Sequence, residues 1–432
     1  MINNLRKPYI LNLLFGVLIT LLVFGRPLLG VYIIGFRLAE FLVGFSILIT
    51  IYYLYSVKEF KNSLGNKIIY THLFIIFTFL CTLVIYPSDV LNIYTIKNSI
   101  NIWYVSYFFL GYIVFNNFYL KKVYFYWGYS GLALVYILNS IYYPNFLESF
   151  FENYSDKFQY AKAAEIAIFF IFISFFNNKF FINRNSIDIF IIVSSLILPL
   201  VIFKSRSAGV ALIVYFIFEL YTYRHIFQKN LKRNVLVLFI FTSFFALTSH
   251  SLVDNIYTIE ETDQAITGVF KNKYVYSNTY DGTLPIFYIF EGRLYSADGN
   301  LNWRLQLWQD AIKSLTEENK LIVGFGYSQP LPLFQNLNYS GLDSSNENSH
   351  NYFINILLRG GMISLFSFVL LFYYLYYYQK KYLDHKEFLR YLLPLFMISM
   401  FDGSMENPYF GILFFFSLSI FFVKNNIKNI NK

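Results

Sequence analysis

The sequence predicts an all-α, polytopic integral membrane protein with about twelve transmembrane helices and one large extramembrane loop. Of its 432 residues, 57% are hydrophobic and only 14% are charged, whereas a soluble domain carries about 25% charged residues. The apolar residues fall in runs of about 20, the length that a helix needs to cross a hydrocarbon core of about 30 Å. Aromatic residues make up 22% of the chain, and many lie near the ends of these runs, as is typical of the membrane interface.

The apolar runs divide the chain into three parts. Residues 1–249 hold nine predicted spans, residues 250–351 form the large loop, and residues 352–432 hold three more spans. The predicted spans are 9–25, 38–56, 68–86, 98–117, 123–143, 163–181, 187–203, 208–223, 234–249, 352–378, 388–401 and 408–423. We expect the first to be retained rather than cleaved, because no small-residue cleavage pattern follows it and a second span comes soon after.

Basic residues of the short connections fall on one side of this predicted membrane. They are Arg6, Lys7, Lys58, Lys61, Lys67, Lys121, Lys122, Arg224, Lys229, Lys232, Arg233, Lys380, Lys381, Lys386 and the lysines of 424–432. Short basic loops stay in the cytoplasm, so both termini are predicted to be cytoplasmic and the 250–351 loop to lie outside. The same distribution explains the net charge of +9 without a nucleic-acid partner, since the chain has no single basic stripe.

The large loop differs in composition from the rest of the chain. It is rich in Asn, Asp, Ser, Tyr and Gly, and a structureless loop of this length is uncommon unless it has a function. A helix is predicted near 302–315, because Trp308, Ala311, Ile312 and Leu315 recur at steps of three and four residues and form one apolar face. We expect this helix to lie on the membrane surface or to pack over the bundle of spans.

Two arginines are candidates for binding an anionic substrate. Arg206 lies in a tight turn between two spans, Lys204-Ser-Arg-Ser-Ala-Gly209, where its planar guanidinium can bind a phosphate; an arginine that anchors the chain at the interface is an equally good interpretation. Arg304 lies on the loop helix, where a solvated charge is the alternative. The only cysteine, Cys81, excludes an intramolecular disulfide and a thiolate metal cluster.

His350 is the candidate general base. It lies in Asn348-Ser-His-Asn-Tyr352, where the large loop returns to the membrane, and a histidine is able to accept a proton near pH 7. A lone interfacial histidine is also commonly a plain hydrogen-bonding residue. Downstream, Arg359 with Gly360 and Gly361 interrupts the next span.

The remaining charged candidates lie near the predicted outer face or inside apolar runs. Glu406, in the turn 402–408, is a candidate to orient a substrate hydroxyl or pair with an arginine, or it is a solvated carboxylate. Arg37 and Glu40 are one turn apart and are expected to neutralise each other, whereas Glu165 and Glu219 have no obvious partner. The acidic residues and histidines show no metal-ligand spacing, and no cofactor motif is found, so neither a metal nor a cofactor is expected.

In order along the chain, these residues resemble the superfamily of O-antigen polymerases and O-antigen ligases. The matching features are Ser205-Arg206-Ser-Ala-Gly209, Trp303-Arg304-Leu-Gln-Leu-Trp308, Val323-Gly-Phe-Gly326, Ser349-His350-Asn351-Tyr352, Arg359-Gly-Gly361 and Glu406-Asn-Pro408. They cover roughly 200–410, and the first five spans match in topology only. Many ligases show a His-Pro-His-Asn motif, whereas here Asn348 and Ser349 precede the single His350.

The resemblance implies a GT-C-like membrane glycosyltransferase of the bacterial inner membrane, whose donor is an undecaprenyl-diphosphate-linked glycan and whose reaction takes place on the periplasmic face. It implies that His350 activates the acceptor hydroxyl and that Arg206 and Arg304 hold the donor diphosphate. Asn351, Arg359 and Glu406 are further predicted substrate-binding residues. Expected partners are the lipid-linked glycan, membrane lipid and a chain-length regulator protein.

Two other functions stay open at this point. An O-antigen ligase needs the same donor site but transfers the glycan to lipid A–core, and the incomplete paired-histidine motif favours the polymerase. A flippase for lipid-linked glycans needs a polar tunnel through the spans and no large structured outer loop, so the composition of 250–351 argues against it.

Overall fold

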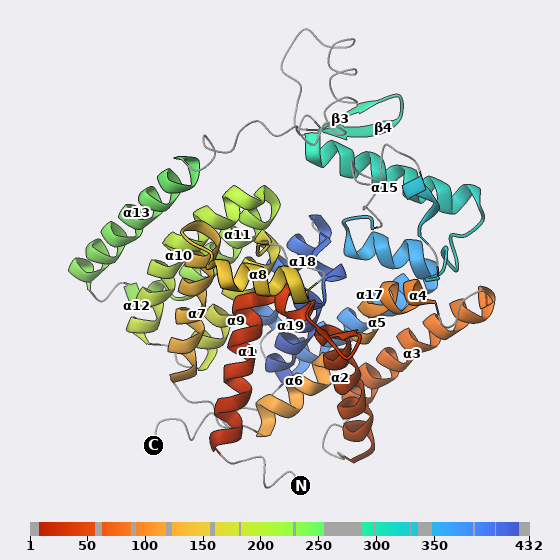
Figure 1. The fold of residues 1–432 in the computed structure, drawn as a ribbon, viewed down its shortest axis with the longest axis horizontal. Helices are drawn as coiled ribbons and strands as arrows, with labels where there is room; N and C mark the ends of the chain where they lie inside the picture. The colour runs from red at the N-terminus through yellow and green to blue at the C-terminus, as the bar shows by residue number, and fades with distance from the viewer. Residues whose placement is uncertain are drawn as a thin grey trace. The chain divides into compact units, whose positions relative to one another are not determined.

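The computed structural model describes most of the chain. The described residues are 8–56, 63–87, 92–117, 123–155, 160–180, 183–227, 230–254, 287–296, 299–328, 330–335, 348–382, 385–401 and 403–422. Helices predominate among these residues, and the strands form two antiparallel hairpins (Figure 1). The all-α prediction is confirmed. The chain folds as two compact units, one of residues 1–62, 103–258 and 376–432, the other of residues 63–102 and 259–375.

The first unit is a bundle of apolar helices. Its helices are α1 (Pro8–Leu29), α2 (Leu38–Ser56), α6 (Ser106–Asn117), α7 (Val123–Ser140), α8 (Asn145–Tyr154), α9 (Ala163–Phe180), α10 (Arg184–Lys204), α11 (Arg206–Thr222), α12 (Arg224–Phe227), α13 (Leu231–Asp254), α18 (His385–Phe401) and α19 (Pro408–Leu418), with the 3-10 turns η5 (Gly403–Glu406) and η6 (Ser419–Phe422) and the hairpin β1 (Tyr32–Ile33) and β2 (Phe36–Arg37). Its centre is densely aromatic; Phe175, for example, packs against Tyr391 and Phe421 at ring distances of 4.6 and 4.7 Å.

The second unit joins two long helices to the described parts of the large loop. It contains α3 (Ser63–Ile85), α4 (Ile93–Asn98), most of α5 (Ile100–Trp103), the hairpin β3 (Phe287–Phe290) and β4 (Arg293–Ser296), α15 (Gly299–Glu317), η4 (Pro332–Gln335) and most of α17 (Tyr352–Tyr382). The hairpin turns at Glu291 and Gly292, which both have positive φ, the backbone that a two-residue hairpin loop requires.

Four of the described helices are long and apolar enough to cross a membrane: Gly65–Ile85, Arg184–Lys204, Leu231–Leu252 and Tyr352–Tyr382. They coincide with the predicted spans 68–86, 187–203, 234–249 and 352–378, so the chain is a multi-pass integral membrane protein. Shorter apolar helices, Gly16–Leu29, Leu38–Tyr52, Ile100–Phe115 and Pro408–Phe422, coincide with four further predicted spans. The total of twelve stays a prediction.

One predicted span is not a single helix. The predicted span 98–117 begins at the last residue of α4 and contains α5 and α6, which are separated by a turn at Tyr104 and Val105. The backbone there makes tight i to i+3 hydrogen bonds, Tyr107 N to Tyr104 O (2.9 Å) and Phe108 N to Val105 O (3.1 Å). Both turn residues are hydrophobic and buried. The apolar run therefore continues through the turn, and hydropathy alone does not reveal the break.

In the folded chain, Glu165 and Glu219 both have partners, although the sequence suggested none for either. The carboxylate of Glu219, which is buried, pairs with Arg390 Nε at 3.1 Å and accepts a hydrogen bond from Asn178 Nδ2 at 2.5 Å. The carboxylate of Glu165, also buried, accepts a hydrogen bond from Asn407. Both partners are distant in sequence, so tertiary packing alone brings them together.

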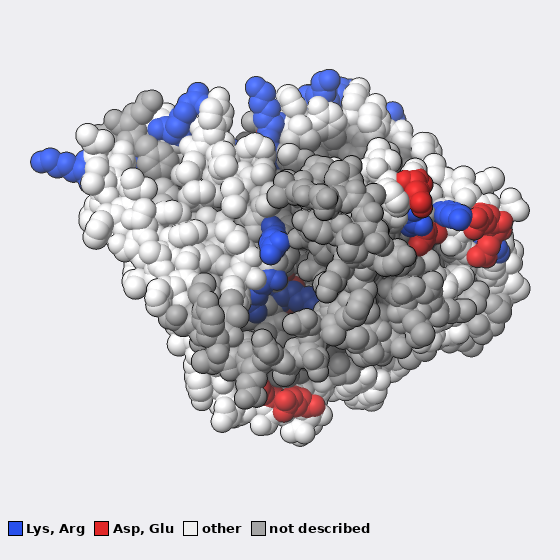
Figure 2. Space-filling view, turned by 90° about the horizontal axis from the view of Figure 1, so that it is seen from above, with Lys and Arg blue, Asp and Glu red and all other residues white. Residues whose placement is uncertain are grey.

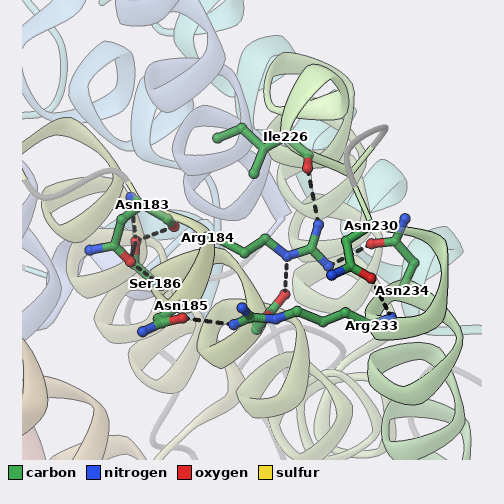
Figure 3. Close-up of polar contacts among 9 residues, drawn as sticks. Asn183, Arg184, Asn185, Ser186, Ile226, Asn230, Arg233 and Asn234 are labelled. Carbon is green, nitrogen blue, oxygen red and sulfur yellow. Dashed lines mark hydrogen bonds and ion pairs between the residues drawn. The ribbon is translucent and has the colours of Figure 1, made fainter.

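Charged side chains also tie α10 to α12 and α13 (Figure 3). Asp188 pairs with Arg184 Nε at 3.0 Å and with Arg233 Nη2 at 2.6 Å, and Arg184 donates to Ile226 O at 3.1 Å and to Asn234 Oδ1 at 2.5 Å. On the face drawn in Figure 2, the charged side chains of the described residues form small groups, and most of the other described residues there are uncharged. Such a surface suits a protein embedded in lipid.

Candidate functional site

The predicted site residues are distributed over the two units. Arg304, His350, Asn351 and Arg359 belong to the second unit, whereas Arg206 and Glu406 belong to the first. The two groups are described separately.

Helix α15 is the loop helix that the sequence predicts near 302–315, and it extends from Gly299 to Glu317. Its buried stripe is Leu307, Ala311 and Leu315, which packs against Phe325, Leu331, Phe334 and Leu358 with Trp303 and Trp308 at the edge. The predicted face was partly wrong, because Ile312 is 42% exposed. A strict four-residue step places Leu307, not Ile312, in line with Ala311 and Leu315.

The hairpin β3–β4 fixes α15 on its polar side. Arg293 Nη2 pairs with Asp310 Oδ1 at 2.6 Å. Gln306 and Gln309 each donate to Leu294 O at 2.9 Å, and Gln309 Oε1 accepts the backbone N–H of Leu294 at 2.9 Å. The helix that carries Arg304 is therefore held on two sides, by apolar contacts on one and by hydrogen bonds on the other.

His350 lies two residues before the start of α17, on a backbone that is fixed on both sides. Trp308 Nε1 donates to Ser349 O at 2.7 Å. Asn351 Oδ1 accepts the backbone N–H groups of Phe353 (3.0 Å) and Ile354 (3.1 Å), which caps α17. The amide oxygen of Asn351, a predicted substrate-binding residue, is thus engaged in the helix cap.

The His350 side chain lies beside an indole. Its ring centroid is 5.4 Å from that of Trp303, with 68° between the ring planes, and the histidine is partly exposed. His350 has a φ of +53°, a left-handed conformation that is uncommon for any residue other than glycine. Such strain is concentrated at functional sites. The sequence motif contains both Trp303 and Trp308, but it did not indicate that Trp303 is the aromatic partner of the histidine.

A break in α17 lies about three turns after His350. Gly361 has a φ of +66° and a non-helical ψ, and a Cβ at this position would collide with Ile322 O. The opened carbonyls of Leu358 and Arg359 accept from Phe325 N (2.7 Å) and Gly326 N (2.9 Å), while Met362 N donates to Leu321 O (2.9 Å).

The two sequence motifs around 323–326 and 359–361 are therefore parts of one structure. Residues 321–327, which we call the 321–327 loop, supply the hydrogen bonds that the broken helix loses. Irregular backbone of this kind is tolerated at membrane depth where it is buried in protein. Gly324, with a φ of +70°, allows the close approach, since a Cβ there would lie 2.6 Å from the carbonyl carbon and oxygen of Arg359.

Arg359 lies beneath this loop and is only 1% exposed. Its Nη1 donates to Gly326 O at 3.4 Å. The neighbouring Tyr327 is also buried, and burial raises the pKa of its phenol to about 12, an effect that the hydrogen bond with Ser364 and the charge of Arg359 partly oppose. In this structure the guanidinium contacts the loop that fills the helix break, so it is placed to hold that loop in position.

Side chains after α3 hold the same loop from the other side. Tyr86 Oη donates to Gly324 O at 2.8 Å and accepts from Lys320 Nζ at 2.9 Å. Asn92 and Asn98 donate to Ser328 O (3.1 Å) and Tyr327 O (3.0 Å). Sequence reasoning missed these residues. The only feature of the sequence that pointed to them was a pair of asparagines, Asn92 in the predicted connection 87–97 and Asn98 directly after it.

In the first unit, Arg206 occupies the expected tight junction. A single residue, Ser205, separates α10 from α11, and its hydroxyl caps α11 at Ala208 N (3.5 Å). Arg206 is the first residue of α11 and is exposed, while Lys204 Nζ donates to Asn139 Oδ1 at 3.4 Å. An exposed arginine in the first turn of a helix is well placed to bind an anion.

Glu406 ends the turn η5 and is partly buried. The next residue, Asn407, caps α19 by accepting Tyr409 N at 3.1 Å and donates to Glu165. The 403–408 turn is thus tied to α9 as well as to α19 through the side chain of Asn407.

Comparison with known families fits this arrangement. Residues 190–369 match the family model described as O-antigen ligase. This match is consistent with the O-antigen polymerase and ligase superfamily. The match includes Arg206, Arg304, His350 and Arg359, whereas Glu406 lies outside it. No curated protein matches the chain significantly. The resemblance seen in the sequence is thereby confirmed, and the match supports a general role in O-antigen or related glycan assembly, for which the family implies a lipid-linked glycan substrate.

Proposed function

We propose that the chain is an O-antigen polymerase that joins undecaprenyl-diphosphate-linked oligosaccharide units into a polysaccharide. The observation that carries this proposal is the family match over 190–369, which contains a histidine held rigidly beside an indole at the start of a broken apolar helix. A rigid, partly exposed base next to a membrane helix suits an acceptor sugar that attacks a lipid-linked donor.

In the proposed reaction, an acceptor hydroxyl oxygen attacks the anomeric carbon of the donor glycan. The bond between that carbon and the diphosphate oxygen breaks, and the lipid diphosphate leaves with the bonding electrons. His350 takes the hydroxyl proton, which contributes about 10²–10⁴-fold to the rate. A single displacement inverts the anomeric configuration and requires neither a covalent enzyme intermediate nor a metal.

Negative charge grows on the departing diphosphate, and we assign Arg206 and Arg304 to it. A guanidinium matches phosphate oxygens with two parallel N–H donors, and fixed donors of this kind stabilise charge most effectively when they are preorganised. Asn351, Arg359 and Glu406 are proposed to support substrate binding. For Arg359 this support is expected to act through the 321–327 loop, because its side chain is buried against that loop.

The proposal places the reaction on the periplasmic face of the bacterial inner membrane. It requires twelve spans in a GT-C-like arrangement, cytoplasmic termini and an outer 250–351 loop, and it includes a chain-length regulator as a partner. The positions of basic residues in the sequence support this topology.

An O-antigen ligase is the second candidate, because the matching family model, which is described as O-antigen ligase, does not distinguish the two functions. A deletion strain distinguishes the two when its lipopolysaccharide is separated on a gel. Core carrying a single unit identifies a polymerase, whereas bare core with accumulating lipid-linked polymer identifies a ligase. An unchanged ladder of chain lengths would contradict both functions.

A further inference from the structure

Two short elements of the first unit, a hairpin and a ten-residue helix, expose apolar side chains. One is the hairpin β1–β2, where Ile33, Ile34 and Phe36 are 42%, 90% and 60% exposed. The other is α8, where Phe146, Phe150 and Tyr154 are 73%, 44% and 58% exposed. These six residues, which we call the apolar platform, would be unfavourable in contact with water.

The two halves of the platform belong to one local structure. Val31, just before β1, pairs with Ser155, just after α8, in an antiparallel bridge. On its other side α8 packs against the end of α1 (Figure 1), where Phe151 is buried and lies 5.8 Å from Phe24. The hairpin and α8 are therefore attached to the same end of α1.

The apolar side chains of α8 follow a four-residue step, so Phe146, Phe150 and Tyr154 form one stripe on the helix. Phe150 and Tyr154 are in ring contact at 5.2 Å. The acidic residues Glu148 and Glu152 lie off this stripe. A short helix with an apolar stripe and a charged remainder is typical of helices that lie in the membrane interface.

The hairpin presents its apolar residues at a tight turn. Ile34 and Gly35 both have positive φ, +52° and +82°, the backbone of a type I′ turn. This conformation is strained for a β-branched residue, and asparagine or glycine is usual there. An isoleucine that is 90% exposed at such a position is explained if an apolar medium covers it.

The platform continues into the apolar surface of α2. Phe36 is in edge contact with Phe41 at 6.0 Å, and Phe41 begins a stripe of exposed residues on α2 that continues with Phe45 and Leu48. With 19 residues, α2 is about 28 Å long, close to the hydrocarbon thickness of about 30 Å. If α2 spans the bilayer, the hairpin lies at the level of the lipid headgroups.

We propose that the apolar platform is a membrane-interface anchor, whose occupant is the headgroup and acyl-chain boundary of the lipid leaflet at the α2 N-terminus. Arg37, at the base of the hairpin and 6.0 Å from the Tyr32 ring, lies at the level of the lipid phosphates in this arrangement. Because the charged side of α8 is acidic, burial of apolar surface rather than attraction to anionic lipid drives the contact.

Spin labelling tests this proposal in the full chain. Cys81, the only cysteine, is replaced by serine, and single cysteines are introduced by Ile34→Cys, Phe150→Cys and Glu152→Cys. Each variant is labelled with a nitroxide and reconstituted in bilayers of phosphatidylcholine with or without phosphatidylglycerol. Collision with oxygen, which partitions into the bilayer, is compared with collision with a water-soluble nickel chelate, after gel filtration shows that the variant is folded.

At positions 34 and 150 we expect oxygen to collide more strongly than the nickel chelate, with the order reversed at position 152 on the charged side of the same helix. The ratio should not change when phosphatidylglycerol is added. Preferential nickel collisions at 34 and 150 would overturn the proposal, because the platform would then face water. Low access to both reagents would also overturn it, since another protein surface would then cover the residues.

Discussion

At the scale of single residues, His350 offers two properties that mutation can separate. Its imidazole is the proposed base, and its backbone is left-handed, with a φ of +53°. Asparagine tolerates this backbone better than most residues but cannot accept the proton. We therefore expect His350→Asn to fold with an unchanged melting temperature and to lose about 10²–10⁴-fold in polymerisation rate, measured in vitro with a purified lipid-linked donor.

The control for His350→Asn is Trp303→Phe, which keeps an aromatic ring beside the histidine and should retain most of the activity. If His350→Asn keeps full activity, the histidine has a conformational role and the proposed base is wrong.

The two arginines assigned to the diphosphate give a second residue-scale prediction. Replacing either Arg206 or Arg304 with alanine should lower the rate by about 10²–10³-fold, the effect of removing one charge-stabilising donor. Lysine at the same position should restore little, because an ammonium lacks the planar pair of donors. The rate of each variant is compared with that of Arg224→Ala, whose guanidinium stacks on Tyr221 at 4.2 Å and should be dispensable for the reaction.

If both arginines act on one diphosphate, the loss in the double variant should differ from the sum of the two single losses on a free-energy scale. Strict additivity would assign the two arginines to independent steps.

Residue types were easier to predict from the sequence than residue partners. Histidine, arginine and glutamate stand out because charge is rare in an apolar chain, so Arg206, Arg304 and His350 could be selected directly. Their neighbours could not: Trp303 lies 47 positions from His350 along the chain, and nothing in the periodicity of the loop helix distinguishes it from Trp308. Leu307 and Ile312 are likewise indistinguishable until packing chooses which of them is buried.

At the scale of elements, the junction between the 321–327 loop and α17 depends on glycine at position 361. A side chain there would meet the Ile322 carbonyl and would also occupy a left-handed backbone. We expect Gly361→Ala to destabilise the junction by at least about 1–3 kcal/mol, which is the cost of the strained backbone alone. The variant should also lose activity, because the 321–327 loop is displaced. A lower melting temperature in detergent would report the first effect.

Two matched glycine variants separate clash from backbone strain. Gly292 has a positive φ of +75° but open space around it, so Gly292→Ala adds backbone strain without a clash. Gly44 lies in a regular helix with open space around it, so Gly44→Ala adds neither. The order of destabilisation should be Gly361 first, Gly292 second, with Gly44 neutral or slightly stabilising. Equal effects at 361 and 292 would show that the junction tolerates a methyl group.

The buried ion pair between α11 and α18 gives a further element-scale prediction. Glu219 is 0% and Arg390 12% exposed at the side chain, and removing one partner leaves a buried charge uncompensated. Arg390→Leu should therefore cost about 3–5 kcal/mol, with partial recovery in the Glu219→Leu/Arg390→Leu double variant. Thermal unfolding in detergent measures both.

The pair of Lys313 and Glu317 is the control, because its side chains are 67% and 64% exposed. Glu317→Gln should cost no more than about 1 kcal/mol. If the Glu219→Leu/Arg390→Leu double variant is no more stable than the single one, the two charges are not coupled.

Helices were predicted well because a single strong signal, the length of an apolar run, sets them. The breaks were harder. Gly361 was expected to interrupt its span, because Arg359 and two glycines stand together, but the break between α5 and α6 lies within buried Tyr104 and Val105 and has no such signal. The hydrogen bonds that repair the α17 break come from Phe325 and Gly326, and only the folded chain shows that these two motifs meet.

At the scale of the whole molecule, α13 is a decisive element for topology. It is one of the four helices long and apolar enough to span a membrane. Lys232 and Arg233 lie in its first turn, and Asp254 lies at its other end. The positive-inside rule therefore predicts that its first turn is cytoplasmic and that the hairpin β3–β4, which follows α13 in the chain, lies on the opposite side.

Two single-cysteine variants in a Cys81→Ser background test this prediction. Ile289, on β3, is 76% exposed, so Ile289→Cys should react in intact spheroplasts with a maleimide that cannot cross membranes. Lys232→Cys, which replaces an exposed lysine, should react only after the membrane is permeabilised. Labelling of both from outside would mean that α13 does not cross the bilayer. The reverse pattern would place the loop in the cytoplasm, away from a periplasmic donor, and would contradict the proposed function as well as the topology.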